Sequence, residues 1–571
     1  MASLQSAWKI TPDEIRVAMR EAVHACNERG LYFSGRWASE ALTGLPPLGT
    51  GKRTRKRRDI TTPWTDSLFL NSTLEATDEA EDEHDSYLLA KTLFDLKEYY
   101  RVAEILKGHT NCKSRFLRLY ATYLAGEKRE QQDRGEIFSH FDNTMKSNKE
   151  LFRLEQELEE GYDADTLDSF CKYLYGVVLT KTQQTSRALT VLIESVHQYP
   201  YNWSAWLEIA SCIPNEESAY SIVDQLPVSF MTSFFLLHAT VEDPVRQDDF
   251  EASWTELSKL FPNSAYVQCE WARYLNNVQA ADMSVEKFEQ LLKDHPYRLD
   301  YMQDYSDALF VTKKYDQLSH LARYCAQVDP FRPETCFVIG NYYTAKGDHE
   351  SSLVYFKRAV RFNRGFSKAW TLMGHEYMEI KNAYSAAEAF RRAIDLNVRD
   401  FRAWVGLGTA YEVARMPHVA CQHYRRACAI RPLEASLWIR VADMLVMIGD
   451  ESAAMICYQQ ILELDNQGAQ IQALKVLPGL YSKAGDIETA ARYYEMSIPM
   501  LSDQDSESNE LANAIMFLAR YERDRENIEK ATRYANQALS VPTVRHQEEA
   551  KILLREMGVM TGSSELEHDM T

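Results

Sequence analysis

The chain has 571 residues, a formal net charge of −19 and a pI near 5.3, which argue against nucleic-acid binding as its main function. Its amino terminus lacks the layout of a secretory signal peptide, and no apolar run approaches the roughly 18 residues of a membrane span. We therefore expect a soluble intracellular protein that engages neither nucleic acid nor membrane.

Residues 1–48 are predicted to form a helical segment. Thr11 precedes Pro12 and an acidic pair, which is typical of an N-cap with proline at the first helical position. Apolar residues follow at helical spacing, and a second helix is expected to end near Pro46.

Residues 49–85 change sharply in composition and are predicted to be a disordered linker. A basic run occupies residues 52–58, and an acidic run extends over residues 75–85. Blocks of like charge with few apolar residues do not bury a core. The basic run is either a nuclear localisation signal or part of a solvated linker, and we expect a protein of the nucleus and cytoplasm.

Residues 86–332 are predicted to form a first array of helix pairs, with a charged and poorly periodic insertion near residues 127–167. The turn residues of this array keep a constant period, although the residues expected in its core vary. These turn residues are Pro262, Pro296 and Pro330.

Residues 333–557 keep the same period more clearly, and residues 558–571 are predicted to be a disordered tail. The recurring residues are Trp370, Trp404 and Trp438; Gly340, Gly374 and Gly408; Tyr343, Tyr377 and Tyr411; and Phe356, Phe390, Tyr424 and Tyr458. This order of tryptophan, glycine, tyrosine and a later aromatic residue, at a period of about 34 residues, is the signature of the tetratricopeptide repeat (TPR).

The spacing within one repeat predicts how it folds. Trp404, Gly408 and Tyr411 share one face of a first helix. A second helix follows after a turn near Pro417. Because a single helix pair cannot bury both of its apolar sides, the pairs must stack. The fold class is therefore predicted to be all-α, a TPR superhelical solenoid of roughly 12–13 helix-turn-helix repeats.

The sequence contains no motif that predicts catalysis. His375 and Glu376 begin like a metalloprotease helix, but Glu379 stands where that motif requires a second histidine. The ten cysteines include no Cys-x-x-Cys pair, which is typical of reduced thiols. Cys421 and Cys428 are assigned to helix packing and not to zinc. We therefore expect a non-catalytic protein with no cofactor and no metal.

The first helices of a TPR solenoid line a concave groove, and the groove-facing places can be counted. They are Glu334, Phe337, Asn341 and Thr344; Lys368, Thr371, His375 and Met378; and Arg402, Val405, Thr409 and Glu412, with Glu379 beside them. Asn341 is suited to pair with both polar groups of an extended peptide. Glu379 and Glu412 are suited to bind a ligand arginine, each charged hydrogen bond contributing about 1.5–3 kcal/mol. The competing interpretation is that these are solvated helix residues.

Several stretches are more specific than generic TPR residues. They are residues 336–343 (CFVIGNYY), 369–379 (AWTLMGHEYME), 399–408 (RDFRAWVGLG), 168–179 (DSFCKYLYGVVL), 294–298 (DHPYR) and 89–99 (LAKTLFDLKEY). They closely resemble the family of subunit 8 of the anaphase-promoting complex, or cyclosome. The resemblance covers most of the chain, apart from the charged linker and an acidic loop near Asp505.

The resemblance implies a non-catalytic scaffold subunit of a multisubunit E3 ubiquitin ligase that controls mitotic progression. Its partners would be the other TPR and scaffold subunits, a second copy of the chain bound through the amino-terminal half, and the activator subunit. The activator's C-box, a short segment containing arginine, would bind in the carboxy-terminal groove. The candidate groove residues are Phe337, Asn341, His375, Glu376, Glu379 and Glu412.

An adaptor of the cochaperone type, which captures acidic carboxy-terminal peptides, is the alternative function. It requires a clamp of lysine and arginine at the groove-facing places. Only Lys368 and Arg402 provide such charges, and Phe337 and Val405 stand where further cations would be needed. Cofractionation with a ubiquitin ligase would favour the scaffold, and binding of an acidic carboxy-terminal peptide would favour the adaptor.

Overall fold

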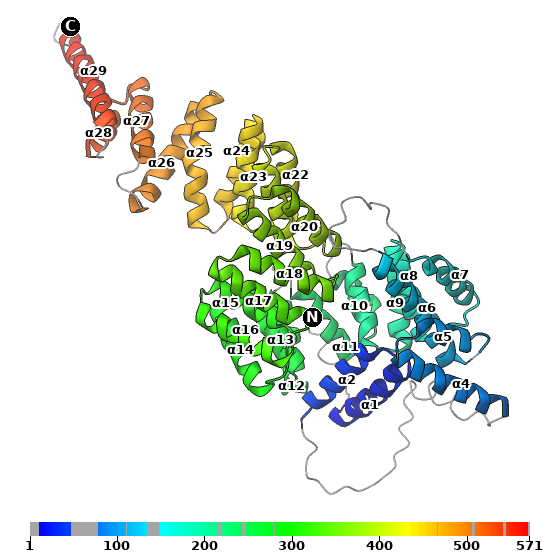
Figure 1. The fold of residues 1–571 in the computed structure, drawn as a ribbon. Coiled ribbons are helices and arrows are strands. Elements are labelled where there is room, and N and C mark those ends of the chain that lie inside the picture. The colour runs from blue at the N-terminus through cyan, green and yellow to red at the C-terminus, as the bar shows by residue number, and fades with distance from the viewer. Residues whose placement is uncertain are drawn as a thin grey trace. The chain divides into compact units, whose positions relative to one another are not determined.

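Twenty-eight α-helices and one 3-10 helix make up the described part of the chain (Figure 1). The computed structural model describes residues 11–46, 78–109, 111–133, 148–213, 219–241, 247–278, 280–464, 466–504, 509–540 and 544–568. These residues contain no β-strand, and the all-α class is confirmed. The chain divides into two compact units, residues 1–345 and residues 346–571, which are described separately below.

Unit 1 begins with two helices and continues as an array of helix pairs. Its elements are α1 (Pro12–Glu28), α2 (Tyr32–Gly44), α4 (Asp78–Asp95), α5 (Tyr99–Ile105), α6 (Cys112–Asp133), α7 (Glu150–Asp163), α8 (Ser169–Lys181), α9 (Thr185–Gln198), α10 (Trp203–Cys212), η1 (Ala219–Gln225), α11 (Phe230–Thr240), α12 (Gln247–Leu260), α13 (Ala265–Asn277), α14 (Ala281–Asp294), α15 (Met302–Val311), α16 (Tyr315–Val328) and α17 (Pro333–Lys346). Most helices pack on the helix before and the helix after, as in a solenoid.

Unit 2 continues the same arrangement of paired helices. Its elements are α18 (His349–Phe362), α19 (Ser367–Glu379), α20 (Ala383–Leu396), α21 (Phe401–Val413), α22 (Pro417–Ile430), α23 (Ala435–Ile448), α24 (Glu451–Glu463), α25 (Gln467–Lys483), α26 (Ile487–Gln504), α27 (Asn509–Asp524), α28 (Ile528–Ser540) and α29 (Val544–His568). The first helices of its repeats are α19, α21, α23, α25 and α27.

The element boundaries can be set beside the predicted domains. The predicted boundary between the two arrays is residue 333, where α17 begins. The observed boundary between the units falls at the other end of α17, because Val338 of this helix joins the core of α15 and α16. α4 begins inside the predicted linker, α7 lies in the predicted insertion, and α29 extends into the predicted tail. The basic run at residues 52–58 lies outside the described residues.

A left-handed turn residue explains the regular joint between the two helices of a repeat. Residues with positive φ stand between α15 and α16, and then once in each of the next four repeats. They are Lys313 (56°), Gly347 (78°), Lys381 (64°), Arg415 (59°) and Gly449 (91°), which are evenly spaced along the chain. The period therefore has a backbone origin as well as a packing origin.

The recurring tryptophans also have a local partner. The indole Nε1 of Trp404 donates to the Val398 carbonyl at 2.8 Å, and that of Trp438 donates to the Pro432 carbonyl at the same distance. Trp206 in unit 1 makes the equivalent bond. Each bond ties the start of a first helix to the loop six residues earlier, so the tryptophan fixes the joint between successive repeats.

The recurring glycines allow close approach of the paired helices. A Cβ atom built on Gly374 would lie 2.5 Å from a ring atom of Phe390, and one on Gly408 would lie 2.6 Å from the ring of Tyr424. Both rings belong to the second helix of the same repeat. Glycine and the later aromatic residue of the signature are therefore two halves of one contact, and the TPR assignment is confirmed.

Candidate peptide-binding surfaces

The six predicted groove residues fall in both units. Phe337 and Asn341 lie on α17, and the other four lie on α19 and α21 of unit 2. Phe337 is fully buried, so its ring lies in the protein interior. Asn341 is buried as well, and its Nδ2 donates to Ser306 Oγ at 2.9 Å and to Asp307 Oδ1 at 3.0 Å. A ligand of Asn341 would have to compete with these bonds to α15.

Glu376 is also engaged inside the protein. Its side chain is buried, and its Oε2 lies 2.8 Å from Nδ1 of His349, at the start of α18. The carboxylate thus ties the two helices together. Counting places in the repeat did not reveal this pairing, because the sequence does not show that a histidine stands opposite.

His375 and Glu379 are the exposed predicted residues on α19. The His375 ring packs edge-on against Phe390, with the ring centroids 5.1 Å apart. Although part of the ring is exposed, partial desolvation lowers the pKa of this imidazole. The positive charge of Arg402 lowers the pKa further, and the negative charge of Asp400 raises it. Glu379 forms no ion pair with any described residue, so its carboxylate is available to a ligand cation.

Glu412 lies on α21 within a small cluster that also contains Tyr424 and Arg440. The Tyr424 hydroxyl donates to Glu412 Oε2 at 2.7 Å, and Arg440 Nη1 lies 3.7 Å from the same oxygen. The Arg440 guanidinium also lies 5.8 Å from the centre of the Tyr424 ring. Desolvation, together with the bond to Glu412, raises the pKa of Tyr424 to about 12, so this hydroxyl remains a donor. Sequence reasoning missed Arg440, although it lies on α23, the first helix of the next repeat.

The first helices of unit 1 carry a second surface, and α2 already covers it. Trp37 on α2 stacks on Trp203 of α10 with ring centroids 4.5 Å apart, and its ring meets Phe234 edge-on at 5.1 Å. Ser34 Oγ donates to Asn202 Oδ1 at 2.9 Å. The partners of α2 are thus first helices of the array, which in a TPR solenoid form the inner side.

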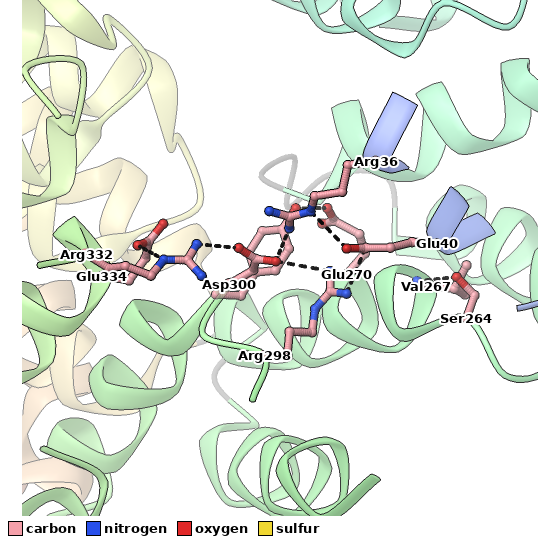
Figure 2. A network of polar contacts seen from close by, with 10 residues as sticks. Arg36, Glu40, Ser264, Val267, Glu270, Arg298, Asp300, Arg332 and Glu334 are labelled. Carbon is pink, nitrogen blue, oxygen red and sulfur yellow. Dashed lines mark hydrogen bonds and ion pairs between the residues drawn. The ribbon is translucent and has the colours of Figure 1, made fainter. Parts of the chain in front are cut away.

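A network of alternating charges also holds α2 (Figure 2). Its six members are Arg36, Glu40, Arg298, Asp300, Arg332 and Glu334. Arg298 Nη1 lies 2.8 Å from Glu40 Oε2, and Arg36 contacts Asp300. Each charged residue of α2 is therefore paired with a residue of opposite charge in the loop that precedes α15. Arg332 extends the network to α17, at 2.8 Å from Asp300 and 3.2 Å from Glu334. Burial would raise the pKa of Asp300, but the three arginines lower it below its ordinary value.

Sequence reasoning did not predict that α2 covers the inner side of unit 1. The spacing around Trp37 predicts only a local helix. Its aromatic partners stand at Trp203 and beyond, far along the chain, so no local spacing could have predicted the contact. Across the described residues, no group of three metal-ligating side chains is found, and no helix is long and apolar enough to cross a membrane.

Paired helices on a constant period, with polar and aromatic side chains along the inner helices, define a protein of the TPR solenoid class. Matches to the tetratricopeptide repeat profile at residues 333–366 and 367–397 agree with this class. The chain belongs to the anaphase-promoting complex subunit 8 / Cdc23 family. The profile of that family matches residues 14–272.

Known relatives support the family over nearly the whole chain. Anaphase-promoting complex subunit 8 of Arabidopsis thaliana is 39% identical, covering 97% of this chain and 98% of that protein. Anaphase-promoting complex subunit 8 of Dictyostelium discoideum is 35% identical, covering 95% and 98%. The crystal structure of the APC/C hetero-tetramer Cut9–Hcn1 contains a similar fold, with a TM-score of 0.50 and 16% identity over 87% of this chain and 93% of that chain.

Proposed function

We propose that this chain is a non-catalytic scaffold subunit of an anaphase-promoting complex, a multisubunit E3 ubiquitin ligase that controls mitotic progression. Family membership over 97% of the chain carries the proposal. A solenoid of stacked hairpins suits this role, because it offers extended surfaces to the other subunits without a catalytic centre. Affinity purification of the tagged chain followed by mass spectrometry tests it. Recovery of the other subunits is expected, and their absence would contradict the proposal.

The amino-terminal half is proposed to form a homodimer, and the protein to reside in the nucleus and cytoplasm. Light scattering after size exclusion tests the first point, with twice the chain mass expected. Imaging of a fluorescent fusion tests the second. Neutralising the basic run at residues 52–58 is expected to lower the nuclear fraction if that run is the import signal.

The inner face of unit 2 is proposed to bind the C-box of the activator through its arginine. Glu379 supports this because its exposed carboxylate has no ion-pair partner in the described part of the chain. Glu412 keeps Oε1 without a hydrogen bond from the described residues, because both of its contacts involve Oε2. His375 adds an exposed ring on the same helix as Glu379. Glu376 is buried and would support this surface without touching the ligand. It would contact the ligand only if the ligand displaced its hydrogen bond with His349.

Mechanistically, the scaffold would act by position. A short segment bound to one face is held weakly, but an activator that also contacts another subunit becomes tethered. Two linked weak contacts raise the apparent affinity by roughly 10²–10⁴-fold. The activator, and a substrate bound to it, would then stay near the catalytic subunits of the complex.

The double variant Glu379→Gln with Glu412→Gln tests the groove assignment. In a reconstituted complex it is expected to bind the activator about tenfold more weakly, because two charged contacts to arginine become neutral. Glu388→Gln is the matched control, since Glu388 is an ion-paired glutamate on α20, a second helix. Helix content and co-purification of the other subunits should not change. Equal activator binding by the double variant and the control would remove the groove assignment.

A further inference from the structure

We propose that Arg440 is a specificity residue of the unit 2 surface. In this inference, the bound segment carries an acidic residue close to its arginine, Arg440 binds the acidic residue, and Glu412 binds the arginine. The inference rests on the proposed function, in that a peptide segment occupies this face. It goes further by stating which charges that segment must carry.

The pair formed by Glu412 and Arg440 is loose and accessible. The two charged atoms are 3.7 Å apart, and the side chains keep 36% and 47% of their surface exposed. Asp443, on the same helix as Arg440, is held more tightly than this pair, because the Tyr458 hydroxyl donates to it at 2.6 Å. Arg440 has no hydrogen-bond acceptor closer than Glu412 among the described residues, so most of its five donors remain open to a ligand.

The geometry makes a ligand with arginine alone a poor fit. A guanidinium arriving at Glu412 would share the carboxylate with Arg440, and two like charges at short range repel each other. The Tyr424 hydroxyl holds the carboxylate on one side, which limits its freedom to turn away. A ligand carboxylate beside the ligand arginine removes the repulsion, because it gives Arg440 its own partner and completes an alternating set of four charges.

Unit 1 contains such a set within one chain. There α2 brings Arg36 and Glu40 against Asp300 and Arg298, and all four charges alternate (Figure 2). The protein thus already binds one of its own segments by the charge pattern inferred for the ligand. In an extended segment, side chains two positions apart point to the same side and lie about 7 Å apart. The simplest ligand therefore has arginine and an acidic residue separated by one residue.

Peptide titration against the full-length protein tests the inference. The probes are fluorescent peptides, acetylated and amidated, of sequence Gly-Ser-Arg-Ala-Asp-Ser-Gly, with Asn or Lys in place of Asp in two further peptides. Anisotropy measures each dissociation constant. The wild type is expected to prefer the Asp peptide over the Asn peptide by about three- to tenfold. A wild type that binds the two peptides equally would overturn the inference.

Variants then assign the preference to Arg440. Arg440→Gln is expected to bind the Asp and Asn peptides equally, and Arg440→Glu is expected to prefer the Lys peptide. Arg392→Gln is the matched control, because Arg392 is similarly exposed on α20 and pairs only loosely with Glu388. This control should keep the wild-type preference. If Arg440→Gln also keeps it, another residue selects the acidic side chain and the inference is wrong.

The outcome separates this inference from the proposed function. Activator loading, measured with the whole activator and the Glu379/Glu412 double variant, reports on the surface itself. If loading depends on the two glutamates but no probe peptide binds the wild type, the inference about Arg440 falls and the proposed function stands. If the peptides show the Arg440-dependent preference but loading is unaffected, the proposed binding of the C-box at this surface falls and the charge selectivity stands.

Discussion

Glu270 shows how single residues of unit 1 depend on their neighbours. This carboxylate on α13 has no exposed surface. Burial would raise its pKa, but Arg273 at 2.7 Å and His238 at 3.3 Å lower the pKa to about 2. The Tyr301 hydroxyl donates a further bond at 3.3 Å. An ionised, fully buried group therefore joins α11, α13 and the residue that precedes α15.

The Glu270→Gln variant is expected to lose about 3 kcal/mol of unfolding free energy at pH 7, because Arg273 loses its carboxylate partner at 2.7 Å. The native pKa lies below the ordinary value of 4.5, so the ionised carboxylate stabilises the fold above that value. This stability is lost as the pH falls from about 4.5 toward 2.

Urea unfolding at pH 7, 5 and 4 measures the effect. The gap between wild type and Glu270→Gln should be wide at pH 7 and pH 5 and begin to narrow at pH 4. Glu388→Gln, which changes a half-buried, ion-paired glutamate, should follow the wild type throughout. A gap that stays constant with pH would show that the loss comes from packing and not from the charge.

At the scale of elements, the two kinds of recurring glycine have different tasks. Gly449 has a φ of 91°, and a Cβ atom there would meet nothing within 4 Å, so only its backbone conformation requires glycine. Gly408 is helical, and a Cβ atom there would press on the ring of Tyr424. The same alanine substitution is thus expected to act by strain at one position and by a clash at the other.

Gly449→Ala is expected to lower the unfolding free energy by about 1 kcal/mol, and Gly449→Asn by less, because asparagine tolerates the left-handed region. At Gly408 the order should reverse, with asparagine worse than alanine, because the larger side chain deepens the overlap. Urea unfolding of the four variants measures both orders. If asparagine is no better than alanine at position 449, the turn does not depend on backbone conformation.

The same scale explains what the sequence could predict. The helices and their period could be predicted because each repeat is closed by local contacts, such as Trp404 with the carbonyl six residues earlier. The faces of the first helices followed from the same spacing. Whether a side chain on that face is free to bind a ligand depends on the residue that lies opposite it. The repeat pattern does not predict that His349 lies beside Glu376 or that Ser306 lies beside Asn341.

At the scale of the whole molecule, the docking of α2 joins segments that are distant in sequence. Trp37 reaches Trp203, and Glu40 reaches Arg298, which stands 258 residues further along the chain. No periodic pattern encodes such a contact. One inner surface is therefore filled by the chain itself, whereas the surface of α19, α21 and α23 carries exposed ions suited to a ligand.

Trp37→Ala is expected to loosen α1 and α2 and to uncover the first helices of unit 1. Removing a buried tryptophan typically costs about 3–5 kcal/mol. In a solenoid, each repeat depends mainly on its neighbours, so the loss should stay local. Hydrogen exchange with mass spectrometry should show faster exchange in α1, α2, α10 and α13 and no change in α23–α28. Higher salt should add to the effect in α2, because it screens the charge network.

Trp438→Ala is the matched control, since it removes a tryptophan of unit 2 that bonds to its own loop. It should speed exchange in α23 and its neighbours and leave α1 and α2 unchanged. The two variants together separate a local solenoid from a cooperative whole. If Trp37→Ala also speeds exchange in α23–α28, the two units do not respond independently, and the docked α2 stabilises the entire chain.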